Sequence, residues 1–212
     1  MAEKNDYVNR ELSWIEFNYR VLSEARDKST PLFDRLKFLS ITASNLDEFY
    51  MVRVASLKDM VHAKYAKKDI AGLTAKEQLD KISEKTHQLV DLQYSTYNRS
   101  LVPALKQNGL RIVMEHEDLT EDEAAFADEY FHKNVYPVLT PMAFDSSRPF
   151  PLIRNKTLNI AALLKKKNEK EAELEFAMVQ VPSVIPRIVE LPEERNENGE
   201  TQRVVILLDG DH

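Results

Sequence analysis

Apolar residues recur at helical spacing through the first half of the chain. After Ser13 they lie three or four positions apart, or side by side, at Trp14, Phe17, Val21, Leu22 and Ala25. Ser13 and Glu16 have the spacing of a capping box, in which a hydroxyl and a carboxylate bind the free amides at a helix start. The pattern therefore predicts an amphipathic helix that begins at Ser13.

Three more helices are predicted before residue 100. Thr30 would cap the second helix, and Pro31 would occupy its first position, which suits Pro. Ser44 would cap the third, and Thr74 with Glu77 forms a capping box that opens the fourth. The inner stripe of the fourth helix is Leu79, Ile82, Thr86, Leu89 and Gln93. We expect the four helices to pack as an antiparallel bundle.

After residue 100 the pattern changes to short elements of both kinds. A helix from Pro103 would end at Gly109, a strand is predicted at residues 111–114, and Thr120 would cap a helix that runs to Lys133. From residue 157 four apolar runs are typical of strands: TLNIAALLK, ELEFAMVQVP, PRIVEL and RVVILLD. Asn198-Gly199, between the last two runs, is a strong hairpin-turn signal.

These patterns predict an α+β protein with two domains. An antiparallel helical bundle would occupy residues 1–105, and a mixed α/β domain with β-hairpins would occupy residues 106–212. The sequence ends directly after the apolar run RVVILLD. We therefore expect the second domain to be incomplete at its carboxy-terminal end.

Two positively charged features lie in this second domain. Arg148 follows YPVLTP in a stretch with four prolines, which we expect to be extended and not helical. Its guanidinium could meet a phosphate or pin the loop to Asp145, and the residues favour pinning. The Lys165–Lys170 run reads as a solvated hairpin tip more readily than as an anion site.

Composition excludes several classes of function. The sequence has no Cys, so it has no disulfide, thiolate nucleophile or cysteine metal site. No apolar run approaches the roughly 20 residues that span a membrane, and the first residues lack a signal-peptide core. A net charge of −6 argues against broad nucleic-acid binding. These features fit a cytoplasmic globular protein.

The sequence contains no recognisable catalytic set. Glycine-rich phosphate loops are absent, and the histidines lack metal-ligand spacing. We expect surface positions for His62, His87, His116, His132 and His212. Asp47 and Glu48 are adjacent on a predicted helix and point in different directions, so they are not a paired acid–base site.

Asn45, in the stretch SNLDEFY, is the candidate binding residue. It would lie at or just inside the start of the third helix, where free amides and its own side chain could hold an anion or a nucleobase edge. The residues alone favour a simple cap at Ser44 or Asn45. Asp47 and Glu48 add negative charge, so a base or ribose suits this position better than a bare phosphate.

Three long blocks resemble one family. They are NRELSWIEFNYRVLSEA, PLFDRLKFLSITASNLDEFYMVRVASLK and YPVLTPMAFDSSRPFPLIRNKTLNIA, in that order. Together they resemble the amino-terminal part of bacterial polyphosphate kinase, the large type that is phosphorylated on histidine. The resemblance covers nearly the whole chain, which would comprise the helical domain and part of the head domain.

The resemblance implies a function for the full-length enzyme. It would transfer the terminal phosphate of ATP to inorganic polyphosphate, reversibly, through a phosphohistidine and with Mg²⁺. The helical domain would cover the ATP or ADP, with Asn45 as the nucleotide contact, and the head domain would support a homo-oligomer. The full-length enzyme would be cytoplasmic or associated with a membrane surface, without an integral membrane segment.

The resemblance also implies what lies elsewhere. The phosphorylated histidine and the metal-associated arginines would belong to two carboxy-terminal domains that are similar to the phospholipase D fold. We therefore expect no kinase activity, and weak nucleotide binding, from these 212 residues alone. Two alternatives are a non-catalytic interaction module for a protein partner and a purely structural dimerisation unit. Loss of ATP affinity in Asn45→Ala would separate the enzyme hypothesis from both.

Overall fold

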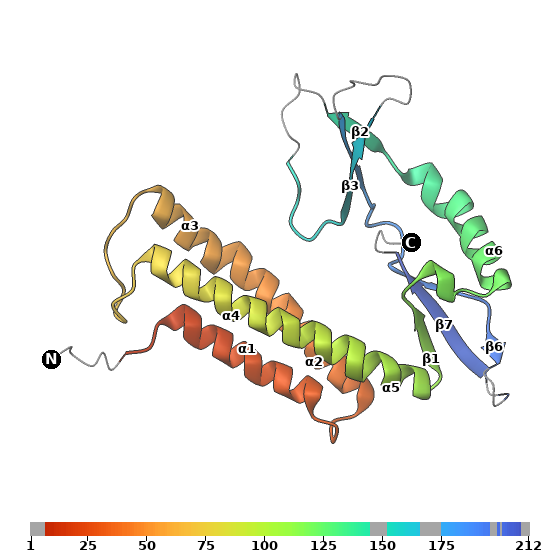
Figure 1. Cartoon of the computed structure of the whole chain (residues 1–212), viewed down its shortest axis with the longest axis horizontal. Coiled ribbons are helices and arrows are strands. Elements are labelled where there is room, and N and C mark those ends of the chain that lie inside the picture. Colours follow the sequence, from red (N-terminus) through yellow and green to blue (C-terminus); the bar gives the residue numbers. More distant parts are fainter. Residues whose placement is uncertain (1–6, 145–151, 166–174, 196–198, 200, 209–212) are drawn as a thin grey trace. The chain divides into compact units, whose positions relative to one another are not determined.

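The computed structural model describes residues 7–144, 152–165, 175–195, 199 and 201–208. The chain divides into two compact units, Met1–Gln107 and Asn108–His212 (Figure 1). The first unit is helical, and the second combines helices with small sheets. This is the α+β class that the sequence predicts.

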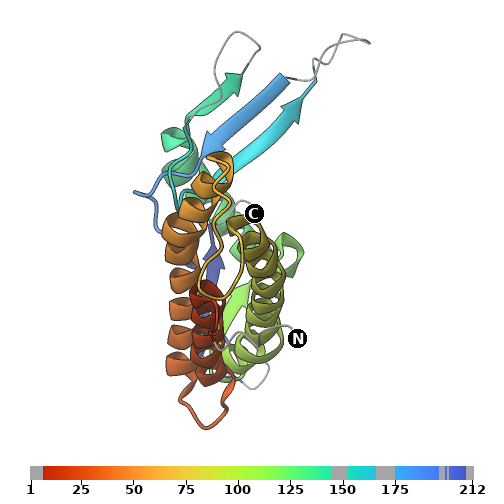
Figure 2. The same ribbon diagram turned by 90° about the vertical axis from the view of Figure 1, so that its left-hand side faces the viewer.

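Three helical rods form the first unit, and they run side by side in two views (Figures 1 and 2). The first rod is α1 (Arg10–Arg26). The second rod joins α2 (Leu32–Phe49), the π-helical turn η1 (Tyr50–Val54) and α3 (Ala55–His62). The third rod joins α4 (Ala75–Thr96), the π-helical turn η2 (Tyr97–Leu101) and α5 (Val102–Gln107).

The prediction of a separate helix capped by Ser44 is wrong. Ser44 lies inside α2, and the helical backbone continues through η1 into α3. Residues 32–62 contain no Gly or Pro that would break a helix. The buried face also continues without a gap, through Leu39, Phe49, Val54 and Leu57. Packing against neighbouring rods therefore outweighs the local capping signal at Ser44.

The helix starts show two further corrections and one confirmation. The first helix begins at Arg10, where Asn9 Oδ1 accepts from the Leu12 amide at 2.9 Å, so the predicted Ser13 box lies inside the helix. The predicted cap at Thr30 is wrong, because Pro31 itself occupies the cap position of α2, without a side-chain capping bond, and Leu32 is the first helical residue. The capping box at Thr74 is confirmed: its hydroxyl accepts from the Glu77 amide, and the Glu77 carboxylate accepts from the Thr74 amide.

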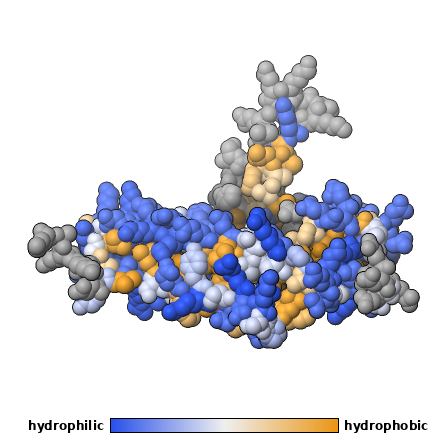
Figure 3. Space-filling view, turned by 60° about the horizontal axis from the view of Figure 1, so that its bottom comes forward, coloured by the Kyte–Doolittle hydropathy of each residue, from blue (hydrophilic) through white to orange (hydrophobic). Residues whose placement is uncertain are grey.

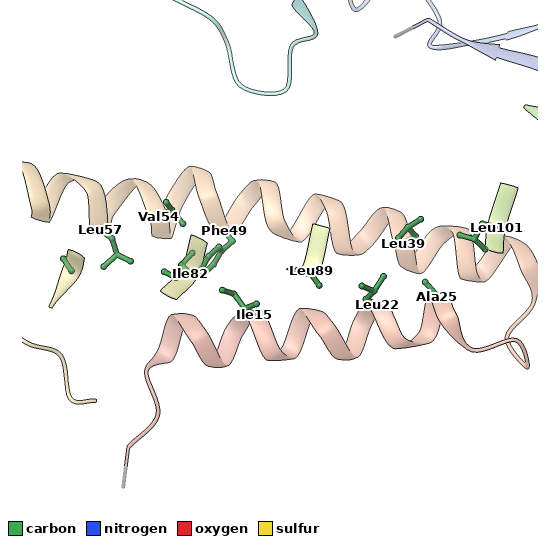
Figure 4. Close-up of a cluster of buried hydrophobic side chains, with 11 residues drawn as sticks. Ile15, Leu22, Ala25, Leu39, Phe49, Val54, Leu57, Ile82, Leu89 and Leu101 are labelled. Carbon is green, nitrogen blue, oxygen red and sulfur yellow. The ribbon is translucent and has the colours of Figure 1, made fainter. Parts of the chain in front are cut away.

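The core of the helical unit lies where α1 packs against α2 and α4. Ile15, Leu22 and Ala25 on α1 are fully buried and point toward the second rod (Figure 4). The predicted inner stripe of α4 is confirmed, because Ile82, Thr86, Leu89 and Gln93 are buried and Leu79 packs against the core. Hydrophobic residues on the outside are scattered among polar ones in the view of Figure 3.

The second unit contains a mixed sheet in the order β1-β7-β5, with β6 also paired to β7. Its strands are β1 (Leu110–Val113), β5 (Ile188–Glu190), β6 (Glu194–Arg195) and β7 (Thr201–Leu207). β1 and β7 run parallel, whereas β5 and β6 pair with β7 antiparallel. Phe126 and Tyr130 of α6 (Glu121–Tyr130) pack on a core that includes Val113 and Val204.

The predicted turn at Asn198-Gly199 agrees with the structure in the conformation of Gly199. Gly199 has a φ of +79°, the left-handed conformation that favours glycine, while Asn198 lies outside the described residues. The strand that pairs with β7 next to this turn is the two-residue β6. The run PRIVEL supplies β5, which pairs with β7 further along the strand.

A second sheet has the order β2-β4-β3 and is antiparallel throughout. Its strands are β2 (Pro141–Phe144), β3 (Asn159–Leu164) and β4 (Glu175–Gln180). The predicted pairing of TLNIAALLK with ELEFAMVQVP is confirmed. The expectation that YPVLTP is not helical is wrong at its start, because Tyr136–Val138 forms a 3₁₀ turn with Pro in its first positions, where no amide donor is needed.

None of the helices within the described residues combines the length and the apolar character that crossing a bilayer requires.

Candidate functional site

A pocket of about 260 Å³ opens between α1 and the junction of α2 with η1. Aromatic, amide and charged side chains line it together. They are Trp14, Phe17, Asn45, Glu48, Phe49, Val52 and Arg53. All of these residues belong to the helical unit, so this pocket is complete within that unit.

Aromatic rings form one wall of the pocket. Trp14 and Phe49 stack with ring centroids 4.4 Å apart and planes 7° from parallel. Phe49 is only 2% exposed, and Tyr50 meets its edge at 6.1 Å. Phe17 is half exposed, and the Arg20 guanidinium lies 5.6 Å from its ring. Flat, fixed rings of this kind suit a flat ligand.

A pair of amides forms another part of the wall. Asn45 Nδ2 donates to Asn18 Oδ1 at 3.1 Å. Asn18 Nδ2 in turn donates to the main-chain carbonyl of Thr42 at 3.0 Å. Asn18 is completely buried, and Asn45 is partly exposed. Asn45 is therefore held in place from below while it faces the pocket.

The structure corrects the predicted surroundings of Asn45. It lies in the last part of α2 and not at a helix N-terminus. In the interior of a helix the main-chain amides bond to carbonyls of the preceding turn, so no free amides are available for an anion. Any contact with a ligand must therefore come from the Asn45 side chain.

The charges around the pocket are nearly balanced. Arg53 Nη1 lies 3.4 Å from Glu11 Oε1, and the Glu11 side chain is the more buried partner. Glu11 Oε2 is buried and has no hydrogen-bond partner among the described residues. Glu48 adds a second carboxylate, and among the described residues Arg53 is the only basic one that lines this pocket. This arrangement does not favour a phosphate.

Asp47 and Glu48 line different hollows on the two sides of α2. Glu48 lines the pocket beside Asn45, whereas Asp47 lines an apolar hollow of about 330 Å³ between α2 and α4. The prediction that these neighbouring carboxylates point in different directions is confirmed. They cannot act together on one substrate.

None of the other candidate residues that the structure describes lines this pocket. Arg148 is outside the described residues, and of the lysine run only Lys165 is described, exposed at the end of β3. His62 and His87 are exposed in the helical unit, and His116 and His132 are exposed in the second unit. The last predicted histidine, His212, is outside the described residues.

Sequence reasoning missed several residues that build the pocket. The sequence pattern places Trp14 on an apolar helix face and does not single out Phe49, Asn18 or Arg53. A signal for Asn18 did exist, since it is a polar residue one position after Phe17 on a predicted inner face. Its partner is 27 residues away in sequence. A local pattern could not pair them.

Comparison with known proteins gives the family. The family described as "Polyphosphate kinase N-terminal domain" matches residues 7–113, and "Polyphosphate kinase middle domain" matches residues 122–209. The chain belongs to the polyphosphate kinase family. The first match contains every residue of the pocket.

Individual relatives agree with this assignment. The chain is 54% identical to a polyphosphate kinase of Lactiplantibacillus plantarum over 90% of its own length and 26% of that relative. It is 48% identical to a polyphosphate kinase of Bacillus anthracis over 96% of its length and 29% of that relative. The chain thus spans under a third of the curated polyphosphate kinases that it matches.

A solved structure supports the fold. The crystal structure of polyphosphate kinase from Porphyromonas gingivalis matches with a TM-score of 0.80 and 33% sequence identity. The match covers 97% of this chain and 29% of that one. The two units described above therefore correspond to a known part of a longer polyphosphate kinase.

Proposed function

We propose that the helical unit forms one wall of the nucleotide site in a longer polyphosphate kinase. That enzyme would transfer the terminal phosphate of ATP to polyphosphate, reversibly, through a phosphohistidine carried by the rest of the polypeptide. The observation that carries the proposal is the Asn45 amide, which faces an aromatic-walled pocket and is held by Asn18. Family membership supplies the substrate class.

The chemistry of the pocket supports contact with the base of the nucleotide. Trp14, which stacks on buried Phe49, and half-exposed Phe17 offer apolar area, and an amide offers a hydrogen-bond donor and acceptor at its edge. Glu11 and Glu48 offset the charge of Arg53. The phosphates would therefore lie against cations on another part of the enzyme, where phosphoryl transfer needs them.

The metal also belongs elsewhere in this proposal. Within the described residues, no group of three potential ligand side chains gathers to hold a metal ion. These residues do not fit a Mg²⁺ site, so no step is assigned to Mg²⁺ here. The 212 residues alone would then lack kinase activity and bind ATP weakly, because one wall provides few desolvated contacts.

The second unit supports the proposal that this region takes part in a homo-oligomer or contacts the remaining polypeptide. Ile160, Leu163 and Leu164 on β3 are all exposed, with Leu163 at 67%. Successive residues of a strand point to opposite faces, so both faces of the β2-β4-β3 sheet carry exposed apolar side chains. Such a sheet is suited to being covered by another domain or subunit. The same feature would serve a non-catalytic interaction module in the cytoplasm.

The test of the proposed function uses the full-length enzyme. Asn45→Ala should raise the KM for ATP about threefold to tenfold, the loss that follows from one or two neutral hydrogen bonds. Asn98→Ala is the matched control, because Asn98 is an exposed asparagine on η2 outside the pocket. It should leave the KM unchanged. An unchanged KM in Asn45→Ala would contradict the proposal and favour the interaction module.

A further inference from the structure

The side-chain amides of Asn45 and Asn18 form a chain of hydrogen bonds that ends at the main-chain carbonyl of Thr42. This carbonyl can only accept a hydrogen bond. The Thr42 main-chain carbonyl has no proton, so the Asn18 atom 3.0 Å away from it must be the donor nitrogen. Asn18 Oδ1 then faces Asn45 and accepts. Complete burial of Asn18 leaves no water as an alternative partner. The orientation of Asn18 is therefore decided by its surroundings.

The same logic fixes Asn45. Because Asn18 presents an oxygen, Asn45 must turn its Nδ2 toward it. Asn45 Oδ1 is thereby directed away from Asn18. The pocket is thus offered an acceptor, together with the second proton of Nδ2. A freely rotating amide would offer either order.

This fixed order distinguishes two kinds of purine. Adenine carries an amino group at position 6, which can donate to Asn45 Oδ1 while a ring nitrogen accepts from Nδ2. Asparagine reads adenine in nucleic acids through the same pairing. Hypoxanthine and guanine carry a carbonyl at position 6, which would place two acceptors against each other when the base takes the same orientation as adenine.

We propose that Asn18 is a positioning residue that fixes the Asn45 amide and thereby gives the site its preference for 6-aminopurine nucleotides. This inference rests on the proposed nucleotide contact at Asn45. Asn18 itself lies below Asn45, is fully buried and does not line the pocket. It acts only through the orientation of its neighbour.

The experiment compares ATP with ITP in the full-length enzyme, because ITP has a carbonyl at position 6 and lacks the 2-amino group of GTP. The ratio of kcat/KM for the two nucleotides is measured in wild type and Asn18→Leu. The ratio does not depend on the folded fraction of the enzyme. We expect wild type to prefer ATP and Asn18→Leu to lower the preference roughly threefold to tenfold, through KM and not kcat.

Two further variants isolate the cause. Asn18→Asp keeps an oxygen that accepts from Asn45, and its carboxyl, held protonated by complete burial, can donate to the Thr42 carbonyl in place of Nδ2. This variant should therefore retain most of the wild-type preference. Ile82→Val trims a buried core residue of the same unit without touching the amides, so it should lower stability and leave the preference unchanged. Equal loss of preference in Asn18→Asp and Asn18→Leu would overturn the inference.

The outcomes also separate this inference from the proposed function. If Asn45→Ala weakens ATP while Asn18→Leu changes ATP and ITP in parallel, the nucleotide contact stands and the role of Asn18 is refuted. If Asn45→Ala leaves ATP unaffected, the proposed function fails, and the inference fails with it.

Discussion

The helical unit and the α/β unit bury their apolar residues to different degrees. In the helical unit the core is closed around α1, and Ile15, Leu22 and Leu89 are fully buried. In the α/β unit, five of the six residues of β3 are exposed along an apolar strand. The core of the helical unit is therefore covered by that unit itself. The β2-β4-β3 sheet instead exposes apolar side chains that another domain or subunit could cover.

The largest expected effect contrasts two leucines. Leu22→Ala should lower the free energy of unfolding of the helical unit by about 2–5 kcal/mol, because it leaves a cavity in a packed core. Leu163→Ala on β3 should change stability by about 0.5 kcal/mol or less, since the side chain is 67% exposed. Denaturant unfolding of the 212-residue chain measures both. Similar losses of unfolding free energy in Leu22→Ala and Leu163→Ala would contradict the difference in burial between the two units.

A second contrast concerns the two capping boxes. Glu123 in α6 closes the same motif as Glu77 in α4, but it is buried and also pairs with Arg111 of β1. Glu123→Gln should cost about 1.5–3 kcal/mol, the range for hydrogen bonds to charged groups. Glu77→Gln should cost less, because that carboxylate is exposed to solvent. Thermal unfolding of both variants tests this order, and a larger loss in Glu77→Gln would reverse it.

The smallest expected effect is a pH dependence of the α4 start. The Thr74 amide, and then its hydroxyl, donate to Glu77 and lower the pKa of that carboxyl. A carboxyl whose pKa is lower in the folded state stabilises the fold above its ordinary pKa, and this contribution is lost as the pH falls through the folded value. Helical circular dichroism from neutral pH to about pH 2 should therefore show a steeper acid loss in wild type than in Glu77→Gln. Identical acid profiles would show that Thr74 does not hold the carboxylate.

Local patterns in the sequence predict much of the fold, and the errors have physical reasons. The box at Thr74 and the cap at Thr120 are confirmed because their bonds join residues three apart. The capping signal at Ser44 is also local, and it predicts a helix start that is wrong. The buried face that continues past Ser44 packs against the other rods, and a local pattern does not show this packing. Asn9 was missed as a cap, and its side chain also contacts Asp69 and Gln78, which are far away in sequence.

The candidate site could be predicted only in part. Resemblance to a family drew attention to Asn45, and the structure places it in a pocket. Its position within α2, its bond to Asn18 and the stacking of Trp14 on Phe49 all depend on packing between α1 and the second rod. Contacts of this kind join residues roughly 30 positions apart, so spacing along the chain does not reveal them.

The most direct test of the nucleotide contact is photolabelling of the full-length enzyme with 8-azido-ATP, followed by mass spectrometry of the labelled peptides. We expect labelled peptides from α1 or the α2–η1 junction, including the region of Trp14 or of Phe49 and Tyr50, and protection of these peptides by excess ATP. Labelling confined to the remaining polypeptide, with ATP protection only there, would contradict the claim that the helical unit forms a wall of the nucleotide site.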